Sequence, residues 1–268
     1  MRPTERPSRH RHLERMTTRE LLDGISAEDR TVADAVAEAI PQLERLVDAT
    51  HARLAAGGRL FYLGAGTSGR LGVVDASECP PTFGVPHGLV VGLIAGGDGA
   101  IRRAVEFAED DRDGGWRDLR AHDCGPEDVV VGIAASGTTP YVLGGVADAR
   151  AEGCATGCVT CFPGSPLARA AEWPVEIDTG PEFVTGSTRM KAGTAQKLAL
   201  NMLTTSVMVK LGRVRDNRMV DMALSNDKLW ERGVRMLRES DPSLSVADAR
   251  ARLERYGSVR AALDAAAE

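Results

Sequence analysis

The sequence predicts an α/β fold in which a mainly parallel, five-stranded sheet lies between two layers of helices, followed by a small helical segment. Short continuous apolar runs recur along the chain, and such runs are typical of strands that are buried on both faces. Longer stretches with apolar residues at helical spacing lie between them. Strands that alternate with helices form right-handed βαβ units, and such units build a parallel sheet that is covered on both faces.

The elements follow from these runs in chain order. Predicted strands span 60–63, 89–95, 129–134, 155–162 and 175–177. Predicted helices span 28–56, 70–77, 100–107, 113–121, 141–152, 185–211 and 226–239, with two more in 244–267. Pro41 can split the first helix, and Tyr256-Gly257 separates the last two. We divide the chain into an N-terminal arm with a short helix (1–27), a central α/β domain (28–222) and a C-terminal helical segment (223–268).

Composition excludes several classes of protein. The 268 residues are 43% hydrophobic and 26% charged, which is ordinary for a soluble globular protein of one large domain, with or without an appendage. A net charge of −5 gives no general attraction to nucleic acid or membrane, and no apolar run is long enough to span a bilayer. Residues 1–16 are basic but lack the apolar core of a signal peptide, so we expect a mobile arm there and a cytoplasmic protein.

The first strand leads into a glycine-rich turn, Gly64-Ala65-Gly66-Thr67-Ser68-Gly69, and then into a helix. The first N–H groups of a helix have no partner inside the helix, and the helix dipole also favours an anion at this end. Thr67 and Ser68 add hydroxyl groups where an N-cap would stand. The turn is therefore predicted to bind a phosphate group.

Neither nucleotide motif is complete in this turn. Gly64, Gly66 and Gly69 match the dinucleotide fingerprint GxGxxG, but the acidic residue expected about 20 residues later is missing. A P-loop would need Lys-Ser or Lys-Thr where Arg70-Leu71 stands. Hydroxyl groups packed into the turn suit a small sugar phosphate better, and an ordinary glycine-rich turn is the remaining alternative.

A second turn repeats the pattern after the third strand, as Ser136-Gly137-Thr138-Thr139-Pro140. Ligands of parallel sheets bind at the carboxyl ends of the strands, where both turns lie. Ser187 and Thr188 are expected N-caps of the long helix, and Lys191 is one of only four lysines in the chain. The predicted phosphate- and substrate-binding residues are Gly66, Thr67, Ser68, Gly69, Ser136, Gly137, Thr138, Thr139, Ser187, Thr188 and Lys191.

The five cysteines are predicted to be free thiols without a metal. An odd number in a cytosolic chain argues against a disulfide framework. Cys154, Cys158 and Cys161 have the CxxxCxxC spacing of an iron–sulfur loop, but they lie in a predicted strand, where the first two would face one side and the third the other.

The histidines form no recognisable constellation. The candidate acid/base groups are Glu78, which ends the helix after the first turn beside Cys79-Pro80-Pro81, and Glu109, which follows the helix after the second strand. Carboxyl groups near apolar and proline-rich walls can have the raised pKa values that a general acid or base needs near neutral pH.

Four segments together carry a strong family resemblance: GAGTSGRLGVVDASECPPTFG (64–84), AEDD (108–111), GIAASGTTPYVLG (132–144) and VTGSTRMKAGTAQKLALNML (184–203). They resemble the N-acetylmuramic acid 6-phosphate etherase family, which belongs to the sugar-isomerase (SIS) domain superfamily. The resemblance runs from about Thr4 to about Ala267. Three features depart from the family pattern. The TExRN motif appears as Thr4-Glu5-Arg6-Pro7-Ser8, Thr138 replaces the arginine of SGRTPY, and the C-terminal helical segment is short.

The resemblance implies a three-layer SIS fold and a lyase that removes D-lactate from N-acetylmuramic acid 6-phosphate by elimination and hydration, in cell-wall amino sugar recycling. It assigns Glu78 as the acid that protonates the departing lactate and Glu109 as the acid/base group at C2. It implies no cofactor, no metal, and a homodimer with the site near the interface.

Two other functions remain open on the residues alone. The glucokinase regulatory protein senses sugar phosphates without turning them over, but it has two such domains in a longer chain. A sugar-phosphate isomerase of the same fold would share the phosphate turns but would not need the ASECPPT segment. Release of lactate from the muramic acid phosphate distinguishes the etherase from both.

Overall fold

The computed structural model describes residues 3–265, and its contacts divide the chain into two compact units. The first unit comprises the residues up to Ser77 together with Leu89–Thr205. The second comprises Glu78–Gly88 together with the residues from Ser206 onward. Each unit is described by itself below.

The first unit contains a five-stranded sheet in the order β2-β1-β3-β4-β5, and every neighbouring pair is parallel. The strands are β1 (Leu60–Gly64), β2 (Val90–Ile94), β3 (Val129–Ile133), β4 (Ala155–Thr160) and β5 (Trp173–Glu176). The five apolar runs of the sequence are therefore strands, as predicted. β1, β3 and β4 are buried along their whole length, which explains why their sequences are continuously apolar.

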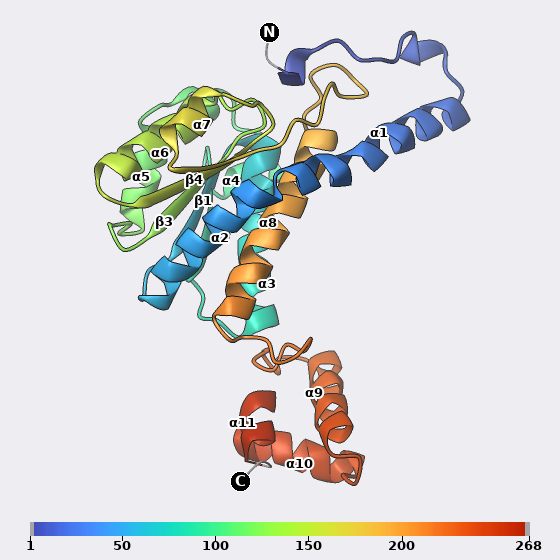
Figure 1. Cartoon of the computed structure of the whole chain (residues 1–268), viewed down its shortest axis with the longest axis vertical. Helices are drawn as coiled ribbons and strands as arrows, with labels where there is room; N and C mark the ends of the chain where they lie inside the picture. Colours follow the sequence, from blue (N-terminus) through green and yellow to red (C-terminus); the bar gives the residue numbers. More distant parts are fainter. Residues whose placement is uncertain (1–2, 266–268) are drawn as a thin grey trace. The chain divides into compact units, whose positions relative to one another are not determined.

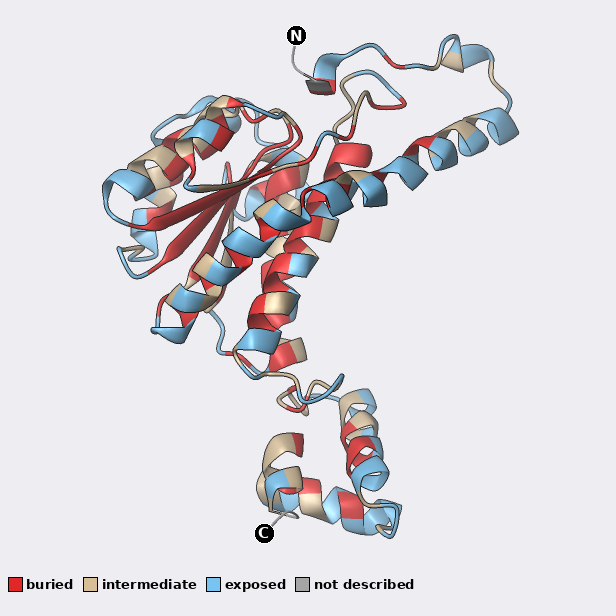
Figure 2. Cartoon of the chain, in the orientation of Figure 1, coloured by how far each residue is buried: buried red, intermediate tan, exposed pale blue. Residues whose placement is uncertain are grey.

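Helices cover both faces of this sheet (Figure 1). On one face lie α5 (Gly114–Ala121), α6 (Pro140–Ala151) and the short α7 (Pro166–Ala170), which the sequence did not predict. On the other face lie α2 (Ile40–Ala55), α3 (Gly66–Phe83) and α8 (Lys191–Lys210). Figure 2 shows that the buried side of these helices faces the sheet. The predicted α/β/α sandwich is confirmed.

The long N-terminal helix divides where Pro41 predicted a break, into α1 (Thr18–Glu38) and α2. Before α1, two short 3-10 turns span Pro3–Glu5 and Leu13–Arg15. The arm that contains them is bound to the domain, which contradicts the expected mobile arm. The Ser8 hydroxyl donates to the carbonyl of Phe183 (2.7 Å), and the Ser8 N–H donates to Thr185 Oγ1 (2.9 Å).

The predicted helix over 100–107 is wrong beyond its first turn. Helix α4 covers only Gly99–Arg102, and a 3-10 turn follows at Ala108–Asp110. The Arg70 guanidinium takes the carbonyls of Ala100 (2.7 Å) and Ile101 (2.8 Å) as acceptors. These are the carbonyls that the next helical turn would need, so the chain leaves the helix there.

Helix α3 is longer than predicted at both ends. It begins at Gly66, so Thr67 and Ser68 lie in its first turn and are not N-caps as expected. At the other end it includes Pro80 and Pro81 and runs to Phe83. Pro80 and Pro81 have no N–H, so the end of the helix lacks the two hydrogen bonds that these positions would otherwise donate. Gly84 then ends the helix with φ +62°.

The start of α8 also differs from the prediction. The expected N-caps were Ser187 and Thr188, but the helix begins at Lys191. Its first N–H groups, those of Lys191 and Ala192, donate to the two carboxylate oxygens of Glu182, each at 2.9 Å. A carboxylate satisfies two of the unpaired N–H groups at once and carries the charge that the helix dipole favours.

The second unit has its own small core around α9 (Asp227–Ser240), α10 (Val246–Tyr256) and α11 (Val259–Asp264). Gly257 with φ +73° separates the last two helices, as the sequence predicted. Its buried apolar residues are Val220, Met222, Val234, Met236, Leu237, Ala249, Leu253, Val259 and Ala262. The end of α3 belongs to this unit, because the Ala223 N–H donates to the carbonyl of Pro81 (3.3 Å).

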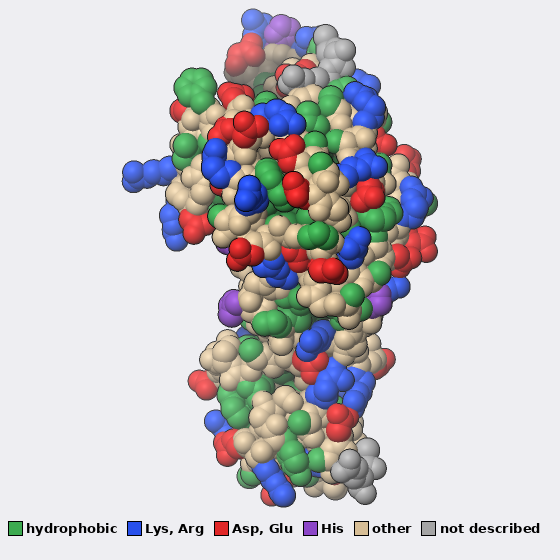
Figure 3. All heavy atoms as spheres, turned by 90° about the vertical axis from the view of Figure 1, so that its left-hand side faces the viewer, with side chains coloured by type: hydrophobic (Ala, Val, Ile, Leu, Met, Phe, Trp, Pro, Cys, Tyr) green, Lys and Arg blue, Asp and Glu red, His purple; other side chains and the backbone are tan. Residues whose placement is uncertain are grey.

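Two surface features bear on the class of partner. Within residues 3–265, no helix is both long enough and apolar enough to cross a membrane. On the face shown in Figure 3, basic and acidic side chains are interspersed. A surface of this kind offers no extended basic patch for a nucleic acid on that face.

Candidate sugar-phosphate site

The two predicted phosphate turns leave neighbouring strands at the same edge of the sheet. β1 pairs with β3 so that Gly64 lies opposite Ile133. The first turn enters α3 at Gly66, and the second enters α6 at Pro140. The amino ends of both helices, with their unpaired N–H groups, therefore follow directly on the carboxyl ends of adjacent strands.

Glycine is required in the first turn because strand and helix approach closely. A Cβ atom on Gly64 would lie 2.6 Å from the backbone nitrogen of Gly69. At Gly66 there is room for a side chain, since no atom lies within 4 Å of an added Cβ, but its φ of +53° favours glycine.

The hydroxyls of the first turn lie against the first turns of α8. Ser68 is buried, and its Oγ donates to Oε1 of Gln196 at 2.9 Å. A Cβ atom on Gly193 would lie 3.4 Å from the Thr67 methyl carbon, so these two residues are close neighbours. The Gly193 N–H donates to the carbonyl of Thr188 (2.9 Å). The structure thus gathers Thr67, Ser68 and Thr188, three of the predicted residues, around one end of α8.

The second turn is held by its own hydroxyls. Ser136 Oγ accepts hydrogen bonds from the Thr138 N–H (3.3 Å) and from Thr138 Oγ1 (3.2 Å). Gly137 has φ +60°, and a Cβ there would lie 2.4 Å from Ser165 Oγ, so only glycine fits. Ser136, Thr138 and Thr139 are half-buried.

A cavity of about 190 Å³ adjoins the first turn. Gly66 and Arg70 line it on one side and residues 104–109 on the other. Glu109 is among the lining residues, and its side chain is exposed. The structure therefore brings one predicted acid/base residue to the predicted phosphate turn. Arg70 was not predicted as a site residue, although it lies in the wall of the cavity.

The other predicted acid/base residue, Glu78, lies on α3 and belongs to the second unit. Its side chain is exposed, whereas its neighbour Cys79 is buried. Within the same unit, a Cβ atom on Gly84 would lie 1.8 Å from the carbonyl oxygen of Asp221. The ASECPPTFG segment is thus packed closely at its glycine, while Glu78 faces solvent.

A buried carboxylate fixes α3 to the sheet and to α8. Asp75 accepts hydrogen bonds from the Tyr62 hydroxyl (3.0 Å), from Asn201 Nδ2 (2.7 Å) and from Thr204 Oγ1 (3.3 Å). Burial raises the pKa of the Asp75 carboxyl, and these hydrogen bonds oppose the shift. The network holds the helix that carries the first turn in one position.

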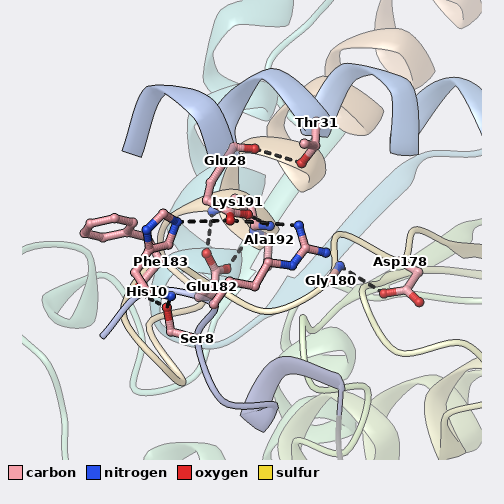
Figure 4. A network of polar contacts seen from close by, with 11 residues as sticks. Ser8, His10, Glu28, Thr31, Asp178, Gly180, Glu182, Phe183, Lys191 and Ala192 are labelled. Carbon is pink, nitrogen blue, oxygen red and sulfur yellow. Dashed lines mark hydrogen bonds and ion pairs between the residues drawn. The ribbon is translucent and has the colours of Figure 1, made fainter. Parts of the chain in front are cut away.

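Lys191 has a different partner from the phosphate that the sequence predicted. Its Nζ lies 2.6 Å from Oε2 of Glu28 on α1, and both side chains are buried (Figure 4). His10 Nε2 lies 3.3 Å from the other Glu28 oxygen, and Arg9 lies 3.9 Å from it. Burial raises the pKa of the Glu28 carboxyl, but Lys191, His10 and Arg9 together lower it by more, so the pKa is below its ordinary value of 4.5. Lys191 therefore joins α8 to α1.

None of the five cysteines, all of which lie within residues 3–265, forms a disulfide in the structure. Cys154 and Cys158 pack in the core on the α6 side of the sheet, whereas Cys161 Sγ points to the carbonyl of Ala192 (3.8 Å), so the predicted opposite facing is confirmed. Burial raises the pKa of Cys158 and of Cys161 to about 12. Within residues 3–265, no three His, Cys, Asp or Glu side chains are grouped as a metal site would need.

The fold and the two hydroxyl-bearing turns define a SIS domain, the class of α/β domain that binds sugar phosphates. Residues 112–206 match the family model described as SIS domain, and residues 38–150 match the glucokinase regulatory protein N-terminal SIS domain. Two solved structures share the fold at low identity. A phosphoheptose isomerase from Francisella tularensis has a TM-score of 0.57 at 18% identity, covering 72% of this chain and 100% of its own. A putative phosphosugar isomerase from Bacteroides fragilis has a TM-score of 0.53 at 19% identity, covering 72% and 92%.

Curated relatives narrow the class to one family. An N-acetylmuramic acid 6-phosphate etherase of Christiangramia forsetii is 62% identical over 98% of this chain and 95% of its own length. Relatives with the same name from Porphyromonas gingivalis and Bacteroides thetaiotaomicron are 58% and 55% identical, over 97% and 98% of this chain and 94% of theirs. The chain belongs to the N-acetylmuramic acid 6-phosphate etherase family, as the motifs predicted.

Some residues that shape the site could not be found from the sequence. Gln196 and Glu28 contact partners that lie 128 and 163 residues away in the chain, so local patterns do not reveal them. Glu182 lies nine residues before Lys191, outside the spacing of a helix-capping motif. The one available signal was for Gln196, which lies in the GTAQK segment that carries the family resemblance.

Proposed function

We propose that this chain is a cytoplasmic lyase that cleaves the D-lactyl ether of N-acetylmuramic acid 6-phosphate, giving N-acetylglucosamine 6-phosphate and D-lactate. The observation that carries the proposal is 62% identity over nearly the whole chain to a relative named as this etherase. The reaction belongs to the recycling of cell-wall amino sugars. By family resemblance the protein acts as a homodimer with its site near the interface.

The chemistry follows from the poor leaving ability of an alkoxide. Direct displacement at C3 would need attack on an unactivated ether carbon. The open-chain aldehyde at C1 instead makes the proton on C2 acidic, so a base can remove it. The C3–O bond then breaks, lactate leaves with a proton from an acid, and a C2–C3 double bond forms. Water adds its oxygen to C3, and a proton returns to C2, so one water is consumed overall.

Two carboxyl groups supply the proton transfers in this proposal. Glu109 lines the cavity beside the first phosphate turn and acts at C2. Glu78 protonates the departing lactate, a role that rests on the family resemblance of the ASECPPT segment. A positioned general acid or base contributes a factor of about 10²–10⁴ to the rate. No metal or redox cofactor is needed, because the aldehyde supplies the activation.

The phosphate is held by the hydroxyls and N–H groups of the two turns, chiefly through Ser68 and Ser136. The burial of Ser68, the glycines beside both serines and the two helix starts support this assignment. A non-catalytic sugar-phosphate sensor is the alternative, since residues 38–150 match a domain of a regulatory protein. Incubation with N-acetylmuramic acid 6-phosphate and measurement of free D-lactate separates the two, because a sensor releases none.

Replacing Ser68 or Ser136 by alanine is expected to raise KM with little change in kcat. Each hydrogen bond to a charged group is worth about 1.5–3 kcal/mol, so each substitution should raise KM by about 10- to 100-fold. Steady-state kinetics of lactate release gives both constants. Ser26→Ala, an exposed serine on α1, is the matched control and should leave both constants unchanged. A normal KM in Ser68→Ala or Ser136→Ala would show that the turns do not hold the phosphate.

A further inference from the structure

Gln196 is a buried amide that the reaction scheme above leaves without a role. It lies on α8, is 1% exposed, and accepts the Ser68 hydroxyl proton on Oε1 at 2.9 Å. Its Nε2 is also buried, yet within residues 3–265 no hydrogen-bond partner is found for it. A buried N–H group without a partner is costly, so its presence beside the phosphate turn calls for an explanation.

The serine proton has to be shared between two acceptors. A serine hydroxyl carries one proton, and here that proton goes to Gln196 Oε1. A phosphate oxygen can only accept from the hydroxyl. While Gln196 accepts the proton, only the lone pairs of the Ser68 oxygen can face a phosphate, and they repel the phosphate oxygens. Ser68 can therefore bind phosphate only if Gln196 stops accepting.

The amide can do this without moving its backbone. A half-turn about the last side-chain torsion exchanges Oε1 and Nε2, and that torsion is soft and two-fold for an amide. Nε2 then lies 2.9 Å from Ser68 Oγ, where Oε1 lies now, and donates to it. The exchange gives the unpartnered nitrogen an acceptor and releases the serine proton in one movement.

We propose that Gln196 is a positioning residue that turns its amide to convert Ser68 from a donor into the protein to a donor to the substrate phosphate. The inference rests on the proposed function, because it takes Ser68 as a phosphate ligand. It also assigns the neighbouring end of α8 a part in substrate binding. Gly193 lies one helical turn before Gln196 on α8, and the Thr67 methyl group packs close to it. This contact keeps the first phosphate turn against α8.

Two substitutions separate positioning from simple packing. Gln196→Met keeps the length of the side chain but removes both polar atoms. Gln196→Glu keeps the shape but gives a carboxyl that can donate when protonated and can only accept when ionised. The probe is the reaction product, N-acetylglucosamine 6-phosphate, and its dissociation constant is measured by calorimetry. Circular dichroism melting establishes that each variant is folded.

The double-mutant cycle with Ser68 gives the first expected result. Gln196→Met should weaken product binding by about fivefold, the value of one neutral hydrogen bond, because the Ser68 hydroxyl loses the Nε2 donor that directs its proton to the phosphate. In a Ser68→Ala background the same substitution should change the dissociation constant by less than about twofold. A residue that only fills space would weaken binding equally in both backgrounds.

The pH profile gives the second expected result. The ratio of the Gln196→Glu and wild-type dissociation constants cancels the titration of the ligand itself. That ratio should rise by about 10- to 100-fold between about pH 5 and about pH 9, as the introduced carboxyl ionises and holds the serine proton. For Gln196→Met the ratio should stay constant.

Two outcomes would overturn the assignment of Gln196. One is that Gln196→Met and Ser68→Ala weaken product binding additively. The other is that the ratio of the Gln196→Glu and wild-type dissociation constants stays constant over the whole pH range. The wild-type protein distinguishes this failure from failure of the proposed function. If wild type binds the product and releases lactate while the cycle is additive, only the role of Gln196 is wrong. If wild type neither binds nor releases lactate, the proposed function is wrong and this inference falls with it.

Discussion

Replacing Glu109 by glutamine is expected to lower kcat for lactate release by at least about 10²-fold, because the variant has no carboxylate to exchange a proton at C2. The amide keeps the shape of the side chain, and Glu109 lies on an exposed 3-10 turn, so the fold should persist. KM should change little, since the phosphate contacts lie elsewhere in the proposal. Glu78→Gln should give a loss of similar size through the acid step.

Matched controls make this result specific. Asp110 is the exposed residue next to Glu109 and does not line the cavity. Asp110→Asn should therefore keep kcat within about twofold of wild type. Glu231→Gln does the same for an exposed glutamate of the second unit. A kcat for Glu109→Gln as high as that of Asp110→Asn would remove Glu109 from the mechanism.

Lys191→Met is expected to lower the free energy of unfolding by about 3–5 kcal/mol, because it leaves the Glu28 carboxylate buried without its cation. The lysine ammonium lies 2.6 Å from that carboxylate, and His10 and Arg9 offer only longer contacts. Urea unfolding followed by circular dichroism measures the change. Lys197→Met, an exposed lysine on the same helix, should stay within about 0.5 kcal/mol of wild type.

A second substitution tests the reason for the loss. Glu28→Met combined with Lys191→Met removes both charges and should recover most of the stability. Because the folded-state pKa of Glu28 is below its ordinary 4.5, the pair stabilises the fold above pH 4.5 and this contribution is lost as pH falls through the folded-state pKa. If Lys191→Met instead stays within about 1 kcal/mol of wild type, the ammonium does not hold α1 to α8, and its predicted contact with phosphate regains support.

The sheet and both turns could be predicted because their signals are local. Continuous apolar runs such as 129–133 mark strands that are buried on both faces, and β3 occupies that range. The glycine and hydroxyl pattern of Gly64–Gly69 predicted a strand, a tight turn and a helix, and the contact between Gly64 and Gly69 explains it. The family was predicted for the same reason, since its motifs are these local segments.

The errors arose where a side-chain contact from outside the local sequence motif decides where an element begins or ends. The helix at Gly99 stops because Arg70, about 30 residues earlier, binds its carbonyls. Helix α8 starts at Lys191 because Glu182 caps it, although Ser187 and Thr188 are better N-caps by residue type. The N-terminal arm is held by Ser8, whose acceptor on Phe183 lies 175 residues away. Periodicity and propensity carry no information about such pairs.

The most direct test of the account is to run the reaction in heavy-oxygen water and to find the label by mass spectrometry of the separated products. Elimination followed by hydration places the oxygen of water on C3 of the sugar, so N-acetylglucosamine 6-phosphate should carry one heavy oxygen there and D-lactate none. The C1 aldehyde oxygen also exchanges with water and can carry the label. To remove this label, the product is first incubated in ordinary water and its aldehyde is then reduced, so that only the label on C3 remains. Heavy oxygen in lactate, with unlabelled C3, would mean that the bond on the lactyl side is broken, and the elimination mechanism would be wrong.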